Sequence, residues 1–145
     1  MLLPDSKTPS LMGEGADIIA FDGTSRPHDG CSLEEIISTI HNAKRLAMAD
    51  ISTLEEGINC AQLGADIIST TLAGYTLESG EPTEGPDYEL LSELVKTVNK
   101  PVILEGRIWE PDDVKKAFEL GAHCVVIGSA ITRPQLITKR FVDGK

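Results

Sequence analysis

The sequence predicts a parallel α/β fold, because short apolar segments alternate along the chain with segments of helical pattern. The apolar residues of these short segments are continuous, as in strands that are covered on both faces. About five strands are expected, at residues 17–22, 46–50, 66–71, 101–105 and 123–128. The last two strands each end at a glycine, Gly106 and Gly128, beside residues that can bind or react. Such a pair is typical of the final strands of a barrel, where phosphate is often held.

The predicted helices begin at residues that cap helices well. Ser32 and Glu35 have the spacing of a capping box, in which each side chain satisfies a backbone N–H of the first turn. The other expected starts are Ser52 or Thr53 before helix 54–63, Asp87 before helix 88–98, Pro111 in the first turn before 112–120, and Pro134 in the first turn of a final helix 132–142. Gly-Ala pairs begin at residues 15, 64 and 121, and each is followed by a predicted strand. The glycine of each pair suits the end of the preceding helix.

The remaining segments divide the chain into two parts. Residues 1–12 contain two prolines and little periodicity, so we expect an irregular remnant of an upstream segment, followed by one partial barrel domain over 13–145. Residues 72–86 are rich in Gly, Glu, Thr and Pro, and form a long loop after the third strand. A substrate lid and a disordered loop are both consistent with that composition.

Composition excludes several classes of function. The 145-residue chain has a formal net charge of −10, which argues against binding to nucleic acid or to anionic membranes. It shows no signal-peptide pattern and no apolar run long enough to span a membrane. Cys31, Cys60 and Cys124 are odd in number and scattered, as expected for reduced thiols of a cytoplasmic protein. No Cys/His cluster has the spacing of zinc ligands.

Polar groups follow the predicted strands and are expected to meet at one edge of a parallel sheet. They are Asp22 with Thr24 and Arg26, Asp50 with Ser52, Thr70 and Thr71 with Tyr75, Glu105 with Arg107, and Gly128 with Ser129. A carboxylate at such a position can act as an acid or a base. The alternative for Asp22 and Asp50 is that each caps a turn or pairs with an arginine.

Gly106, Gly128 and Ser129 could offer backbone amides and a hydroxyl to an anion. The candidate cations are Arg26, Arg107 and Arg133, each of which could instead form a surface ion pair. Trp109 either lines a pocket or packs on the next helix. The three histidines do not converge, and no lysine ends a strand at this edge.

Several segments together resemble the N-acetylmannosamine-6-phosphate 2-epimerase family, in order and in spacing, from about residue 13 to 142. They are Ile-Ile-Ala-Phe-Asp-Gly-Thr24, Leu-Ala-Met-Ala-Asp-Ile-Ser-Thr-Leu-Glu-Glu-Gly57, Ile-Ser-Thr-Thr-Leu-Ala-Gly-Tyr-Thr76, Glu-Gly-Arg107 and Gly-Ser-Ala-Ile-Thr-Arg-Pro134. The resemblance implies a (β/α)8 TIM barrel that converts N-acetylmannosamine 6-phosphate to N-acetylglucosamine 6-phosphate in bacterial sialic-acid catabolism. It also implies that no metal or redox cofactor takes part.

The resemblance further implies roles for single residues. Glu105 matches a catalytic glutamate, and Asp22 an aspartate that contacts the sugar and orients the site. The residues that match the region holding the phosphate and the polar groups of the sugar are Gly106, Arg107, Gly128, Ser129 and Arg133. The five strands match strands four to eight, whereas the other acid/base group of the family is a lysine at the end of the third.

We therefore expect a truncated form that lacks normal epimerase activity alone and that takes a homodimer partner or an N-terminal barrel segment. Two alternatives stay open. One is another phosphate-binding barrel isomerase, such as a pentose-phosphate epimerase. The other is a non-catalytic half-barrel that binds a phosphosugar or self-associates.

Overall fold

A computed structural model describes residues 15–28 and 30–144, so the predicted irregular segment 1–12 lies outside the described residues. Five parallel strands form one sheet, and their order in the sheet is their order in the chain. The strands are β1 (Ile18–Asp22), β2 (Leu46–Asp50), β3 (Ile67–Ser69), β4 (Val102–Glu105) and β5 (Cys124–Val126). The predicted alternation of strands and helices is confirmed.

The helices between the strands begin at or next to the positions that the capping residues predict. They are α2 (Leu33–Asn42), α3 (Leu54–Leu63), α4 (Tyr88–Thr97) and α5 (Pro111–Glu119), and two more helices, α6 (Ser129–Thr132) and α7 (Pro134–Asp143), follow β5. The side chains of Ser32, Thr53 and Asp87 each accept a hydrogen bond from a backbone N–H of the first turn. No helix in residues 15–28 and 30–144 combines the length and the apolar character needed to cross a membrane.

The predicted final helix over 132–142, with Pro134 in its first turn, is present as α7, but it begins at Pro134 and not at residue 132. The chain forms the short α6 and then α7, with a break at Arg133, whose φ is −119° and ψ is 84°. The cause is local, because the ring of Pro134 disfavours helical geometry at the residue before it. Pro134 itself takes the first position of α7, where a missing N–H costs nothing.

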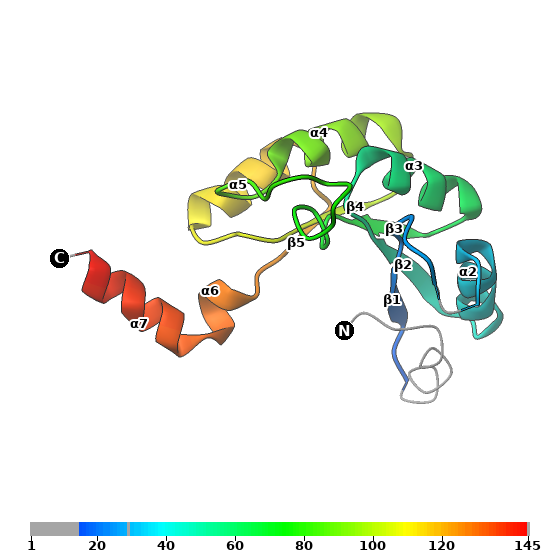
Figure 1. The fold of residues 1–145 in the computed structure, drawn as a ribbon, viewed down its shortest axis with the longest axis horizontal. Coiled ribbons are helices and arrows are strands. Elements are labelled where there is room, and N and C mark those ends of the chain that lie inside the picture. Colours follow the sequence, from blue (N-terminus) through cyan, green and yellow to red (C-terminus); the bar gives the residue numbers. More distant parts are fainter. Residues whose placement is uncertain (1–14, 29, 145) are drawn as a thin grey trace.

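The four helices α2 to α5 cover one face of the sheet, as Figure 1 shows. Alternate strand residues point toward these helices, among them Phe21, Ala49 and Leu104, and all three are buried. The intervening residues lie on the other face, where no described helix packs. Ile18 and Leu46, which are paired in register, are about half exposed there, at 46% and 47%.

The last two helices differ from the others because they project away from the sheet (Figure 1). Neither α6 nor α7 contains a buried residue. Ile131 and Phe141 are exposed apolar side chains in these helices. The sequence after β5 therefore forms helices without forming a core.

The strand register places the predicted polar groups along one edge. Asp22 lies opposite Asp50, and Asp50 lies opposite Ser69. Glu105 on β4 lies opposite Val126 on β5, the last strand of the sheet. Because all the strands are parallel, their carboxyl ends meet at this edge, which is where ligands bind in such folds.

Candidate functional site

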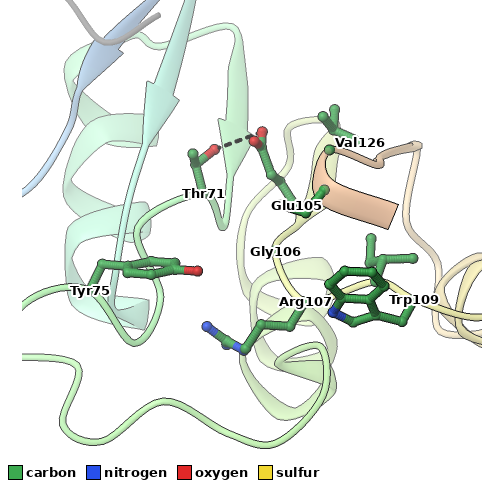
Figure 2. A pocket seen from close by; sticks show the side chains of 10 residues that line it. Thr71, Tyr75, Glu105, Gly106, Arg107, Trp109 and Val126 are labelled. Carbon is green, nitrogen blue, oxygen red and sulfur yellow. Dashed lines mark hydrogen bonds between the residues drawn. The ribbon is translucent and has the colours of Figure 1, made fainter. Parts of the chain in front are cut away.

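A cavity of about 260 Å³ opens at the carboxyl ends of β3, β4 and β5 (Figure 2). The residues that line it come from the segments that follow these three strands: Thr71, Tyr75, Glu105, Gly106, Arg107, Ile108, Trp109, Val126, Gly128 and Ser129. Five of these positions were predicted from the sequence to act in catalysis or phosphate binding, namely Glu105, Gly106, Arg107, Gly128 and Ser129. The sheet thus brings together the two Gly-ended strands.

Glu105 is fixed at the end of β4 by its neighbours on β3. Its backbone N–H donates to the hydroxyl of Thr70, at 3.1 Å, and that hydroxyl donates to the carbonyl of Glu105, also at 3.1 Å. The hydroxyl of Thr71 donates to the Glu105 carboxylate, at 3.2 Å. Since Thr70 is fully buried, the backbone of Glu105 is held in place while its carboxylate reaches the cavity.

The residues after Glu105 have unusual backbone geometry. Gly106 has a φ of 109° and Arg107 a φ of 55°, both in the left-handed region. Glycine reaches that region without strain, and a side chain such as arginine rarely does. The turn directs the Arg107 side chain toward the loop that follows β3.

Arg107 holds this loop through three hydrogen bonds. Its guanidinium donates to the carbonyls of Ala73, at 2.7 Å, and Gly85, at 2.9 Å, and to the hydroxyl of Thr83, at 3.1 Å. The same guanidinium lies 5.9 Å from the centre of the Tyr75 ring. In this conformation Arg107 anchors the predicted loop 72–86, which contains no helix or strand, and its predicted contact with phosphate stays a prediction.

Asp22 is engaged by residues close to it in the chain and does not line the cavity. Its carboxylate accepts from the N–H and the hydroxyl of Thr24, at 3.0 and 2.6 Å, and pairs with Arg26 at 2.6 Å. Burial tends to raise the pKa of Asp22, but the Thr24 hydrogen bonds and the Arg26 charge outweigh it, so the pKa lies below its ordinary value. The alternative in which Asp22 caps a turn and pairs with an arginine is therefore realised here, and its contact with a sugar stays a prediction.

Asp50 is the most buried carboxyl group at this edge, with 4% of its surface exposed. Burial, reinforced by the nearby Glu105 and Asp22 carboxylates, raises its pKa to about 6, against the opposing effect of a hydrogen bond from Thr71. The Thr71 hydroxyl lies 2.7 Å from Asp50 Oδ1. The hydroxyl of Thr71 thus lies between Glu105 and Asp50, a buried carboxyl group with a raised pKa.

Glu56, from the first turn of α3, connects the loops beside these carboxylates. It accepts from the backbone N–H groups of Ser25, Ser52 and Thr53, at 2.8, 2.9 and 3.1 Å, and from two serine hydroxyls. The Ser52 hydroxyl in turn accepts from Thr76, in the loop after β3. One carboxylate therefore joins the loops that follow β1, β2 and β3.

The end of β5 supplies the other wall of the cavity. Gly128 and Ser129 line it, whereas Arg133 is exposed at the break between α6 and α7 and does not. Trp109 lines the cavity, so its pocket interpretation is confirmed, and the Arg140 guanidinium lies 5.2 Å from the centre of its ring. The predicted phosphate-binding residues are thus only partly assembled by the described chain.

Other residues stay apart from the site. His28 contacts the carbonyl of Thr24, His41 pairs with Asp66, and His123 lies in a cavity at the opposite edge of the sheet. No lysine is among the residues that line the cavity beside Glu105.

Thr71 and Tyr75 were expected at this edge of the sheet, among the polar groups that follow the third strand, but the sequence predicted no catalytic or binding role for either. The signal that could have found Thr71 is register. Ser69 lies opposite Ile103, so the residue two positions later lies beside Glu105. Sequence alone does not fix that register.

The chain is similar to one family over nearly its whole length. Residues 6–144 match the sequence model of a family described as "Putative N-acetylmannosamine-6-phosphate epimerase". A relative from Clostridium perfringens strain SM101, described as a "Putative N-acetylmannosamine-6-phosphate 2-epimerase", is 54% identical over 134 residues, which cover 92% of this chain and 60% of that protein. A relative of the same description from Caldanaerobacter subterraneus is 54% identical over 132 residues, covering 88% of this chain and 55% of that protein.

A solved structure gives the same result. The N-acetylmannosamine-6-phosphate 2-epimerase of Clostridium perfringens superposes with a TM-score of 0.93 at 51% identity, and the match covers 98% of this chain and 62% of that one. The chain thus spans about three fifths of the length of these Clostridium perfringens relatives, and its five strands correspond to part of a TIM barrel. It belongs to the N-acetylmannosamine-6-phosphate epimerase family.

Proposed function

We propose that this chain takes part in the epimerisation of N-acetylmannosamine 6-phosphate to N-acetylglucosamine 6-phosphate, and that Glu105 is one of the two acid/base groups. The observation that carries the proposal is the position of Glu105, whose carboxylate reaches the cavity at the end of β4. Gly106 beside it has no side chain, and nothing lies within 4 Å of where a Cβ would stand, so a ligand has room to approach.

The chemistry requires a proton to leave C2 of the sugar and to return on the other face. In the open-chain sugar, C2 is adjacent to the aldehyde, so removal of its proton gives an enolate. Inversion then calls for one acid/base group on each face. Glu105 serves one face, and the resemblance assigns the other to a lysine that is not among the residues lining this cavity.

Phosphate is assigned to the end of β5. Gly128 and Ser129 line the cavity from the strand next to Glu105, and could offer backbone amides and a hydroxyl. Arg133 stays a candidate that would require α6 and α7 to lie closer to the sheet. Asp22 is proposed to orient the sugar from β1, with Arg26 holding its carboxylate.

The test is formation of N-acetylglucosamine 6-phosphate, measured with purified chain in a coupled assay. Because the residues that line this cavity include Glu105 and no lysine, we expect turnover far below that of relatives that span the whole barrel. When the chain is supplied with the three further βα units of a relative, we expect turnover that Glu105→Gln abolishes and that Glu93→Gln, an exposed site on α4, leaves unchanged. Wild-type turnover by Glu105→Gln would refute the acid/base role.

Self-association is a second candidate, because none of the helices in residues 15–28 and 30–144 packs on one face of the sheet. Ile18, Leu46 and Val126 are exposed apolar residues on that face. Light scattering of the purified chain separates the two candidates. A dimer that binds N-acetylmannosamine 6-phosphate but does not form N-acetylglucosamine 6-phosphate supports the non-catalytic role.

A further inference from the structure

The hydroxyl of Thr71 lies between two carboxyl groups that come from different strands. Thr71 Oγ1 is 2.7 Å from Asp50 Oδ1 and 3.2 Å from Glu105 Oε2. The hydroxyl of Ser69 lies 2.8 Å from Thr71 Oγ1 as well. Figure 2 shows the contact with Glu105 at the edge of the cavity. Asp50 is in register with Ser69, so the sheet itself places β3 as the bridge between the two carboxyl groups.

The number of protons decides how these groups can be satisfied. A hydroxyl donates one hydrogen bond and accepts up to two. If both carboxyl groups were ionised, Thr71 could donate to only one of them, and the other would face a lone pair. One proton on Asp50 removes this conflict. Asp50 then donates to Thr71, Thr71 donates to Glu105, and the Ser69 hydroxyl fills the second acceptor site.

The surroundings of Asp50 favour that arrangement. Asp50 and Ser69 are both buried, so an unpaired charge on Asp50 would be costly. Among residues 15–28 and 30–144, the charged groups that act on it are Glu105 on β4 and Asp22 on β1, and both are acidic. Asp22 is already neutralised by Arg26, which leaves no described cation for Asp50 within ion-pair distance.

We propose that Asp50 is a positioning residue that shares one proton with Glu105 through the hydroxyl of Thr71. The inference rests on the proposed function, in which Glu105 exchanges a proton with the sugar. When the proton passes along these two hydrogen bonds, the O–H bonds of Asp50 and Thr71 break and new O–H bonds form at Thr71 and Glu105. The total charge does not change. Glu105 can thus pass from base to acid without taking a proton from solvent.

The test is a pH titration of the side-chain carboxyl carbons by ¹³C NMR, which requires no substrate. In the wild-type chain, we expect the Asp50 and Glu105 carbons to show two common steps, because a coupled pair titrates as one system. Asp50→Asn should leave the Glu105 carbon with a single step. Asp112→Asn, at an exposed position on α5, should leave both steps as they are.

Two variants of Thr71 isolate the hydroxyl. Thr71→Ser keeps it and should keep the common steps, whereas Thr71→Val should remove them while amide spectra show the same fold. Independent single-step curves for Asp50 and Glu105 in the wild-type chain overturn the inference, whether or not any variant folds. If the coupling is found but Glu105→Gln leaves proton removal from C2 unchanged, the proposed function fails and the shared proton stands.

Discussion

The chain has two regions that differ in how they are supported. From β1 to α5, helices and strands share one core, and Ile40, Leu91 and Leu94 are fully buried in it. From β5 onward the burial is low, and α6 and α7 contain no buried residue. The first region carries Asp22, Asp50, Thr71 and Glu105, whereas the second carries Gly128, Ser129 and Arg133, three of the five residues predicted to hold phosphate. The predicted acid/base residues thus stand on the packed core, whereas these three predicted phosphate-binding residues do not.

The largest expected effect contrasts the two regions directly. Leu94→Ala removes a fully buried side chain beneath the sheet and should lower the free energy of unfolding by ~2–5 kcal/mol. Phe141→Ala removes a side chain that is 78% exposed and should change it by less than about 0.5 kcal/mol. Urea denaturation measures both. Similar losses for the two variants would show that α7 packs against the core in solution.

Glu56 tests how the loops of the packed region are held together. Glu56→Gln should lower the free energy of unfolding by ~1–3 kcal/mol, because backbone N–H groups of three residues lose an ionised acceptor. Glu55→Gln, its exposed neighbour, is the matched control.

The effect of Glu56 should depend on pH in a defined direction. Burial tends to raise its pKa, but the hydrogen bonds from Ser25 and Ser52 outweigh it, so the pKa lies below the ordinary 4.5. A carboxyl with a lowered pKa stabilises the fold above its unfolded value and loses that effect as pH falls. The difference between Glu56→Gln and wild type should therefore be largest above pH 4.5 and shrink below it. A difference that grows on acidification contradicts this role.

The sequence predicted the packed region well because its signals are local. Capping residues such as Ser32 and Thr53 act within one turn, and continuous apolar runs located the strands, although the described helices cover one face of the sheet and not both. The break before α7 also had a local signal, the restriction that Pro134 places on Arg133.

The contacts of the site had no such signal, because they join residues far apart in the chain. Arg107 was predicted to hold phosphate, yet its donors reach the carbonyl of Ala73, 34 residues away. Thr71 bridges Asp50 and Glu105 only through the register of three strands. Neither contact follows from composition or periodicity, since a guanidinium or a hydroxyl has many partners within reach of an unfolded chain.

Arg107 gives a smaller and local prediction. Arg107→Lys cannot reproduce the three guanidinium contacts with the loop, so opening of residues 73–85 should become easier by about 1.4 kcal/mol or more. Limited proteolysis should then cut this loop about tenfold faster, while the urea midpoint changes little. Arg133→Lys, at an exposed position outside the cavity, serves as the control. An unchanged cleavage rate would mean that Arg107 does not hold the loop.

The most direct test concerns Glu105 and the proton on C2 of the sugar. N-acetylmannosamine 6-phosphate is incubated with the chain in deuterium oxide, and loss of the C2 proton signal is followed by ¹H NMR. If Glu105 exchanges that proton from one face, the wild-type chain replaces it with deuterium faster than buffer does, without inversion, and Glu105→Gln does not. Equal rates for the wild-type chain and Glu105→Gln would contradict the role of Glu105 as an acid/base group.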